Sequence, residues 1–225
     1  MKEISIRALL FDMDGVVIDS NTEIEQFWMD WAKKENLVLE RKDLIDYVHG
    51  RTTQETIHKL FYNASPELKE EIAKEARAFD LAMRPKLIKG LDGFLNSLLA
   101  NFNKVGLVTS APQQRVKAML DFNGVYNSFS CIVTSDDFKK SKPDPEPYLI
   151  GAKRFNISPS DCLVFEDSNS GISSAIAAGA YVVAIDNYSF KNDKVIACIK
   201  DYENLRIHEN HVVNITEGLK IRLVS

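Results

Sequence analysis

The sequence predicts an α/β fold in which a doubly wound parallel sheet carries an inserted all-helical domain. Two observations favour this class. Short, nearly continuous apolar runs alternate with amphipathic helical stretches, as in a parallel sheet whose two faces are both covered by helices. The alternation stops once, over a stretch of roughly 65 residues that has helical periodicity only.

The expected core elements follow one another in a regular order. Each expected strand is a β-rich apolar run, and each expected helix has apolar residues at helical spacing. Together they indicate a Rossmann-like core formed by residues 1–18 and 86–225. The strands are expected at Ile4–Phe11, Lys104–Thr109, Cys131–Thr134, Cys162–Glu166 and Tyr181–Ile185, and the helices at Gly93–Phe102, Gln113–Phe122, Pro145–Phe155 and Ile172–Ala178.

Residues 19–85 are expected to form the helical insert. Trp28 and Trp31 lie on one apolar helical face, which favours packing inside the insert over a role as stacking platforms. Ser65 followed by Pro66 is typical of a helix start, because proline fits the first helical position. Pro85 marks the return of the chain to the core.

The composition is that of an ordinary globular protein, with 45% hydrophobic and 27% charged residues. The formal net charge of −4 argues against broad binding to nucleic acid or to an acidic membrane surface. Cys131, Cys162 and Cys198 form no Cys-x-x-Cys pair, and the first apolar run is too short for a signal peptide or a spanning helix. We therefore expect a cytoplasmic protein, and the sequence is compatible with a monomer.

Asp12 and Asp14 stand directly after the apolar run that ends at Phe11. Two carboxylates so close together repel each other when both are ionised, which raises the pKa of one of them. Such a pair indicates metal-assisted acid/base or nucleophilic chemistry, with an ordinary acidic turn as the alternative. A calcium-binding loop is excluded, because Val17 stands where that loop requires glycine.

Two more polar clusters follow predicted strands, at the sheet edge where open α/β folds bind ligands. Thr109 and Ser110 precede a helix, so their hydroxyls could cap it, bind a phosphate together with its free N–H groups, or do both, because the same geometry serves each role. Glu166 and Asp167 end a strongly apolar strand, and adjacent carboxylates in such a place favour a hard divalent cation. We expect all three clusters to converge on one site.

Lys142 lies in a stretch with three alternating prolines, which hold it at a defined place before the next helix. A fixed ammonium group can neutralise carboxylates or a transferring phosphoryl group, whereas a solvated surface lysine is the alternative.

In the insert, the polar loop His49-Gly50-Arg51 is a candidate for substrate contact, above all through its arginine. The histidines without metal-ligand spacing are His58, His208 and His211.

Taken in chain order, these clusters resemble the four motifs of the haloacid dehalogenase-like superfamily. The insert resembles the cap of the β-phosphoglucomutase-like branch of that superfamily, and the resemblance spans nearly the whole chain. Within the branch, the chain looks most similar to small sugar-phosphate and glycerol-phosphate phosphatases. The matching motifs are Phe11–Gly15, Val108–Ser110, Lys142–Pro145 and Val164–Gly171.

The resemblance implies a magnesium-dependent hydrolase of small phosphomonoesters. It implies that Asp12 is the nucleophile and that Asp14 serves first as general acid and then as general base. Mg²⁺ would be bound by Asp12, the backbone carbonyl of Asp14 and Asp167, with Glu166 either a ligand or a partner of the ligands. The charge count agrees, because Asp12, Glu166 and Asp167 carry −3 and Lys142 returns only +1.

The resemblance also implies how the phosphate is held. Thr109 and Ser110 would bind the phosphoryl oxygens, while Lys142 would stabilise the charge on them and orient the nucleophile. His49, Gly50 and Arg51 are the expected substrate contacts from the cap, and closure of the cap would exclude bulk water.

Three other functions stay open. Phosphomutases of this branch carry a histidine where this chain has Ile24 and an arginine where it has Thr53, which favours a phosphatase. A dehalogenase attacks carbon without a metal and would not need the acid at Asp14. A non-catalytic binding protein on the same fold is disfavoured, because the motif residues are all present.

Overall fold

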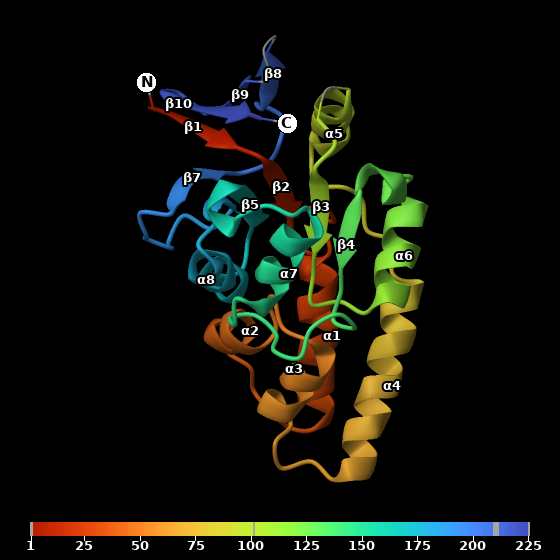
Figure 1. Ribbon diagram of the computed structural model, residues 1–225. Helices are drawn as coiled ribbons and strands as arrows, with labels where there is room; N and C mark the ends of the chain where they lie inside the picture. Colours follow the sequence, from red (N-terminus) through yellow and green to blue (C-terminus); the bar gives the residue numbers. More distant parts are fainter. Residues whose placement is uncertain (1, 101, 209–211, 225) are drawn as a thin grey trace.

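The computed structural model describes residues 2–100, 102–208 and 212–224. Its centre is an all-parallel sheet of six strands in the order β4-β3-β2-β5-β6-β7 (Figure 1). The first of them along the chain, β2, lies in the middle of the sheet, as in doubly wound folds. The strands are β2 (Ala8–Phe11), β3 (Val105–Val108), β4 (Cys131–Val133), β5 (Cys162–Glu166), β6 (Tyr181–Ile185) and β7 (Val195–Ile199).

Helices cover both faces of this sheet. Successive side chains of a strand point to opposite faces, so Leu9 and Phe11 of β2 pack in one apolar cluster with α5 and α6, whereas Ala8 and Leu10 pack in another with α7 and α8. This arrangement confirms the predicted fold class. The helices are α5 (Leu91–Leu99), α6 (Gln113–Phe122), α7 (Glu146–Arg154) and α8 (Asn169–Ala178), with short 3₁₀ helices η1 (Tyr126–Ser128) and η2 (Pro159–Asp161).

Within residues 19–85 the regular elements are all helices, as the periodicity predicts. Trp28 and Trp31 are buried in a separate apolar cluster formed by these helices, so both tryptophans are core residues of the insert. Ser65 begins the last helix, since its hydroxyl accepts a hydrogen bond of 3.2 Å from the N–H of Leu68. The helices are α1 (Asn21–Lys34), α2 (Arg41–Tyr47), α3 (Thr53–Leu60) and α4 (Pro66–Ala82).

The expectation of one strand over Ile4–Phe11 is wrong. The strand is interrupted at Arg7, whose N–H donates to the carbonyl of Asp161. The residues before it form a separate strand, β1 (Lys2–Ile6), which belongs to a second sheet. An apolar run does not reveal a change of partner strand, because the partner of β1 comes from the other end of the chain. The second sheet has the order β1-β10-β9-β8, with β8 (Arg206–His208), β9 (Val212–Thr216) and β10 (Leu219–Leu223).

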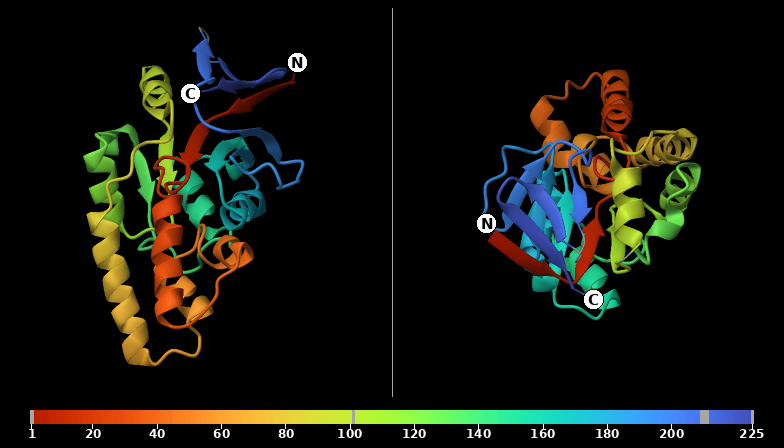
Figure 2. Two further views of the ribbon diagram at one scale, coloured as in Figure 1. Left: turned by 180° about the vertical axis from the view of Figure 1, so that it is seen from behind. Right: turned by 90° about the horizontal axis from the view of Figure 1, so that it is seen from above.

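The small sheet and the helices α1–α4 lie at opposite ends of the molecule, and the small sheet contains the first and the last strand of the chain, β1 and β10 (Figures 1 and 2). The carboxyl ends of the central strands face the helical end, so the predicted site lies far from the termini. Within the described ranges, no helix is at once long enough and apolar enough to cross a membrane.

Candidate active site

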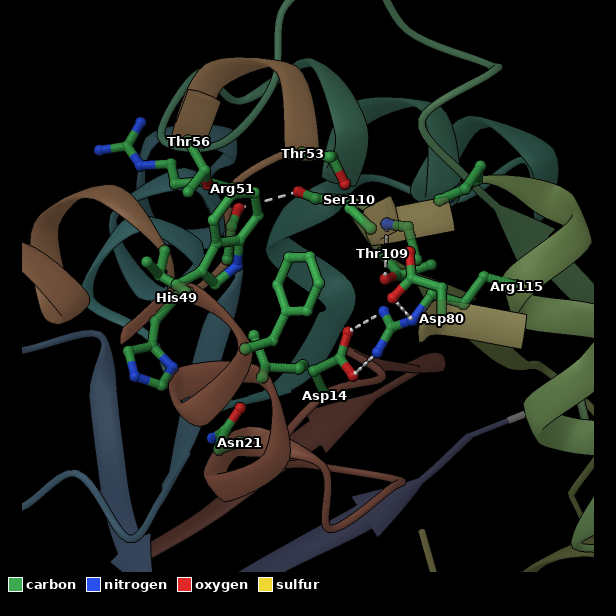
Figure 3. A pocket seen from close by; sticks show the side chains of 18 of the residues that line it. Asp14, Asn21, His49, Arg51, Thr53, Thr56, Asp80, Thr109, Ser110 and Arg115 are labelled. Carbon is green, nitrogen blue, oxygen red and sulfur yellow. Dashed lines mark hydrogen bonds and ion pairs between the residues drawn. The ribbon is translucent and has the colours of Figure 1, made fainter. Parts of the chain in front are cut away.

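A cavity lies between the carboxyl ends of β2 and β3 and the helices of the insert (Figure 3). Asp12, Asp14, Thr109 and Ser110 line its floor, as expected from their places just after β2 and β3. Its roof is largely apolar and is formed by side chains of α1 and α4, among them Ile24, Phe27, Trp28 and Phe79.

Lys142 lies under the cavity floor and has no exposed surface. Its Nζ donates hydrogen bonds of 2.7 Å to Asp12 Oδ1, 2.7 Å to Glu166 Oε1 and 3.1 Å to the carbonyl of Val108. Burial alone would lower the pKa of Lys142, but Asp12 and Glu166 hold that pKa above its usual value. The lysine is therefore a buried ammonium that bridges two carboxylates and is not a solvated surface residue.

Glu166 is completely buried, and both of its carboxylate oxygens are engaged by donors. Besides Lys142, Oε1 accepts from the hydroxyl of Tyr148 at 3.0 Å. Oε2 accepts from the N–H of Ser168 at 2.9 Å and from its hydroxyl at 3.0 Å. A β-carbon on Gly171 would lie 1.5 Å from Oε1, so only glycine fits at that position.

Asp12, Glu166 and Asp167 form a cluster with metal-binding geometry. One carboxylate oxygen from each lies within 4.8 Å of the others. Burial raises the pKa of Asp12 to about 7 despite the attraction of Lys142, and it also raises the pKa of Asp167. Three carboxylates beside one ammonium leave excess negative charge in a buried place, which fits a hard divalent cation with oxygen ligands.

Two neighbours shape the Asp167 side of this cluster. Asn21, the first residue of α1, donates a hydrogen bond of 2.7 Å to Asp167 Oδ2. Gly15 leaves room for that carboxylate, since a β-carbon there would lie 2.2 Å from Oδ2. The insert therefore contributes directly to the carboxylate cluster through Asn21, a residue that the sequence reasoning missed.

The helix-cap alternative for Thr109 and Ser110 is wrong. The N-cap residue of α6 is Pro112, and the hydroxyl of Thr109 instead accepts from the N–H of Ala111 at 3.1 Å. The hydroxyl of Ser110 donates to the carbonyl of Gly50 at 2.8 Å. Both side chains face the cavity close to Asp12, and the phosphate-binding prediction for them remains a prediction.

The loop His49–Arg51 connects α2 and α3 and rests on the core. The carbonyl of His49 accepts a hydrogen bond of 2.9 Å from Ser170, while its imidazole Nε2 lies 2.7 Å from Glu25 Oε1 and points away from the cavity in Figure 3. Arg51 Nη1 donates to the carbonyl of Lys142 at 2.9 Å. These contacts hold the insert against the sheet edge.

Asp14 lies in an ion cluster that the sequence did not reveal. Arg115 of α6 donates hydrogen bonds of 2.6 Å to each oxygen of the Asp14 carboxylate. Its Nε also lies 2.9 Å from Asp80 Oδ1 of α4 (Figure 3). Burial alone would raise the pKa of Asp14, but the guanidinium of Arg115 holds that pKa below its usual value.

The sequence contains one weak indication that Arg115 is buried in an ion pair. Residues four apart share a helical face, so Arg115 lies on the same face of its predicted helix as Met119, an apolar position. A charged residue there needs a buried partner. The partners themselves, Asp14 and Asp80, come from distant parts of the chain and cannot be read from spacing. Of the histidines without a metal-ligand pattern, His211 lies outside the described residues.

Comparison with known proteins agrees with the arrangement of the strands and the site. A family model described as "Haloacid dehalogenase-like hydrolase" matches residues 9–185. Hexitol phosphatase A of Escherichia coli (strain K12) is 30% identical over 186 residues, which are 80% of this chain and 83% of that protein. Glycerol-1-phosphate phosphohydrolase 1 of Saccharomyces cerevisiae is 29% identical over 222 residues, 92% of this chain and 86% of that protein.

Solved structures show the same fold. The crystal structure of β-phosphoglucomutase from Clostridium difficile superimposes with a TM-score of 0.76 at 24% sequence identity, covering 89% of this chain and 93% of that one. The family match covers the strands β2 to β6 and all four helices of the insert. The chain therefore belongs to the haloacid dehalogenase-like hydrolase family.

Proposed function

We propose that the protein is a magnesium-dependent phosphatase that hydrolyses a small sugar or polyol phosphate through an aspartyl-phosphate intermediate. The observation that carries the proposal is the position of Asp12, which lines the cavity, accepts a hydrogen bond from Lys142 and shares a carboxylate cluster with Asp167. In this proposal residues 1–18 and 86–225 form the catalytic domain and residues 19–85 form its cap.

The donor set supports Mg²⁺ as the cofactor. Asp12, Asp167 and the backbone carbonyl of Asp14 would hold the ion, and Glu166 would act through Lys142, because both of its oxygens already accept hydrogen bonds. A bound Mg²⁺ supplies the positive charge that lets a phosphate dianion approach the carboxylates. The protein's own side chains would carry out the nucleophilic attack, the proton transfers and the binding of the phosphate.

Asp12 would attack phosphorus with a carboxylate oxygen, so that a P–O bond to Asp12 forms as the bond to the leaving alcohol breaks. Asp14, two residues away on the same cavity floor, would protonate the departing alkoxide, once its pair with Arg115 has opened and its carboxylate has taken up a proton. It would then take a proton from the water that attacks the aspartyl-phosphate, which releases inorganic phosphate and restores Asp12. The apolar roof of the cavity would keep other water molecules away during this step.

Lys142 would keep Asp12 ionised and correctly turned, since its Nζ is fixed by three hydrogen bonds and has no exposed surface. Thr109 and Ser110 would bind the phosphoryl oxygens from the end of β3. Ser110 donates to the carbonyl of Gly50 in the arrangement described above, so the same hydroxyl would turn to phosphate when substrate enters.

The cavity supports a small, hydroxylated substrate. Asn21, Thr53 and Asp80 line the cavity and offer polar groups beside the apolar side chains of the roof. The two relatives named above are called a hexitol phosphatase and a glycerol-1-phosphate phosphohydrolase, which favours a sugar or polyol phosphate here. The three cysteines are free, which supports a cytoplasmic location, because that compartment keeps thiols reduced.

A phosphomutase is the main competing function. Ile24 and Thr53 stand where mutases of this branch carry a histidine and an arginine, and both line the cavity. An isoleucine cannot transfer a proton and a threonine cannot neutralise a second phosphate, so this cavity favours release of phosphate to water. Isomerisation of a hexose phosphate faster than phosphate release would overturn the proposal.

The proposal is tested with Asp12→Asn and a panel of phosphomonoesters supplied with Mg²⁺. We expect phosphate release from hexitol, hexose and glycerol phosphates by the unaltered protein, and none by Asp12→Asn, because an amide is not a nucleophile toward phosphorus. Asp92→Asn, an exposed change on α5, is the matched control and should keep full activity. Persisting turnover by Asp12→Asn would refute the nucleophile assignment.

A further inference from the structure

Asp80, on helix α4 of the insert, presents a carboxylate to the cavity that the protein itself does not satisfy. Its side chain is 16% exposed and lines the cavity together with Asp14 and Arg115 (Figure 3). Its ion-pair partner is Arg115, whose Nε lies 2.9 Å from Oδ1. Within the described parts of the chain, Oδ2 has no hydrogen-bond or ion-pair partner. This oxygen is therefore available to a donor on a bound ligand.

The contact with Arg115 compensates Asp80 only in part. Nε of Arg115 makes no hydrogen bond to the described residues, and Nη1 and Nη2 both donate to Asp14. Two carboxylates thus share one guanidinium, and burial raises the pKa of Asp80 to about 6 in spite of the attraction of Arg115. A buried carboxylate without a donor is costly to a fold, so stability is a poor explanation for an aspartate at this place.

The apolar side chains near Asp80 make a hydrogen bond at this position valuable. Ala76 and Phe79 of α4 and Phe27 and Trp28 of α1 line the same cavity. In such surroundings a hydrogen bond to a charged acceptor is strong, and an acceptor that loses its water without gaining a donor is costly. A ligand with a hydroxyl group next to Asp80 satisfies the carboxylate, whereas a ligand with only a hydrocarbon chain leaves it unpaired.

The charge of this part of the cavity also restricts the ligand. Asp14, Asp80 and Arg115 together carry −1 in the arrangement described above. An anionic group on the alcohol part of a ligand would be repelled here, because Arg115 already serves two carboxylates. Among the described residues that line the cavity, Arg51 is the other arginine, and it comes from the loop between α2 and α3 instead of this wall.

We propose that Asp80 is a specificity-determining residue, which accepts a hydrogen bond from a hydroxyl group on the alcohol part of the substrate and disfavours esters whose alcohol part carries a further anionic group. This inference rests on the proposed function, in which Asp12 attacks phosphorus and the alcohol departs beside Asp14. Asp80 is separated from Asp14 by a single guanidinium, so it borders the space of the departing alcohol. The substrate class is thereby narrowed to monophosphates of uncharged polyols and sugars.

Three esters with the same three-carbon chain test the hydroxyl group and the charge separately. Glycerol 1-phosphate carries two hydroxyl groups, propyl phosphate carries none, and 3-phosphoglycerate has a carboxylate in place of the terminal hydroxymethyl group. With Mg²⁺ present, the unaltered protein should prefer glycerol 1-phosphate to propyl phosphate in kcat/KM by about tenfold or more, the usual effect of one hydrogen bond to a charged group. It should also prefer glycerol 1-phosphate to 3-phosphoglycerate.

Two variants of Asp80 assign these preferences to its carboxylate. Asp80→Ala should reduce the preference for glycerol 1-phosphate over propyl phosphate by about tenfold, mainly by slowing the glycerol ester. Asp80→Asn keeps the shape of the side chain without its charge, so kcat/KM for 3-phosphoglycerate should rise relative to that for glycerol 1-phosphate. Glu71→Ala, an exposed change on the same helix, is the matched control and should leave both ratios unchanged. Equal losses on all three esters in Asp80→Ala would overturn the inference, because a merely structural role lowers all rates alike.

A binding measurement gives a second readout that does not require turnover. In the Asp12→Asn variant with Mg²⁺, calorimetric titration should show tighter binding of glycerol 1-phosphate than of propyl phosphate. Adding Asp80→Ala should remove this difference, and equal affinities before that change would overturn the inference. A failure of the proposed function would look different, since the unaltered protein would then release no phosphate from any ester, whereas a loss of selectivity alone refutes only the role of Asp80.

Discussion

Lys142 Nζ donates a 2.7 Å hydrogen bond to Asp12 from a position with no exposed surface. The pair joins the end of β2 to the loop before α7, 130 residues further along the chain. The same Nζ donates to Glu166, so one ammonium group serves two buried carboxylates. Removing Lys142 takes this donor away from both carboxylates, and a buried charge that loses its partner is costly.

Lys142→Met should therefore destabilise the fold by about 3–5 kcal/mol, the usual cost of breaking a buried ion pair on one side. Adding Glu166→Gln to this variant should recover part of that loss, because one of the two unpaired charges is then removed. Urea unfolding of both single variants and the double variant measures this coupling. Strictly additive losses would contradict it, and the exposed Lys139→Met is the control, expected to change stability by less than about 0.5 kcal/mol.

Mg²⁺ should raise the melting temperature of the protein and EDTA should lower it again. A ligand present at about 100 times its Kd stabilises a folded protein by about 2.7 kcal/mol, which corresponds to about 5 °C or more for a chain of this size. Asp167→Asn should abolish the shift, because this carboxylate belongs to the proposed metal site. Asp92→Asn should keep it, and an unchanged shift in Asp167→Asn would remove Asp167 from the ligand set.

Gly50→Ala should impair closure of the cap. A β-carbon on Gly50 would lie 2.4 Å from the hydroxyl oxygens of both Ser168 and Ser170, so the loop could not rest on the core. We expect kcat/KM to fall by about tenfold or more, since a shift of about 1 Å in the position of a reacting group can lower the reaction rate by about 10²-fold.

Gly124→Ala is a matched control for this prediction. Gly124 has φ of 72° against 71° for Gly50, so both changes carry the same left-handed strain. Its added β-carbon would meet nothing within 4 Å. Thermal melts should show a larger loss of stability in Gly50→Ala, which adds the close contact to the shared strain, and steady-state kinetics should show a loss of activity in Gly50→Ala alone. Equal activities would mean that the close approach of the loop is not needed.

Arg51→Ala should raise KM and shift the preference among phosphomonoesters. Arg51 lines the cavity and ties the cap loop to the carbonyl of Lys142 at 2.9 Å. Its loss should change the Mg²⁺ concentration required for half-maximal activity much less, because Arg51 makes no contact with the carboxylate cluster. Rates on four or more substrates measure the shift, and an equal effect on all of them would show that Arg51 does not determine specificity.

Much of the core was predictable because local rules govern it. The bounds of β5 and β6 agree with their predicted ranges, and so do those of α6, since apolar runs and helical spacing are properties of short segments. The polar residues after β2, β3 and β5 converge as expected, because parallel strands place their carboxyl ends at one edge. The break between β1 and β2 was not predictable, since it depends on pairing with the end of the chain.

The residues of the proposed site also divide into those that the sequence predicts and those that only the tertiary structure identifies. By itself, the sequence predicted that Asp12 and Asp14, Thr109 and Ser110, and Glu166 and Asp167 would meet at the edge of a parallel sheet, because each pair follows a predicted strand. For Lys142 the pattern left a solvated position open, and its place in the site followed from the family resemblance. Only the tertiary structure decided their partners. Asn21 reaches the carboxylate of Asp167 from the cap, and Arg115 holds Asp14 between α4 and α6. A buried charge requires a partner, but which residue fills that role depends on how distant helices pack.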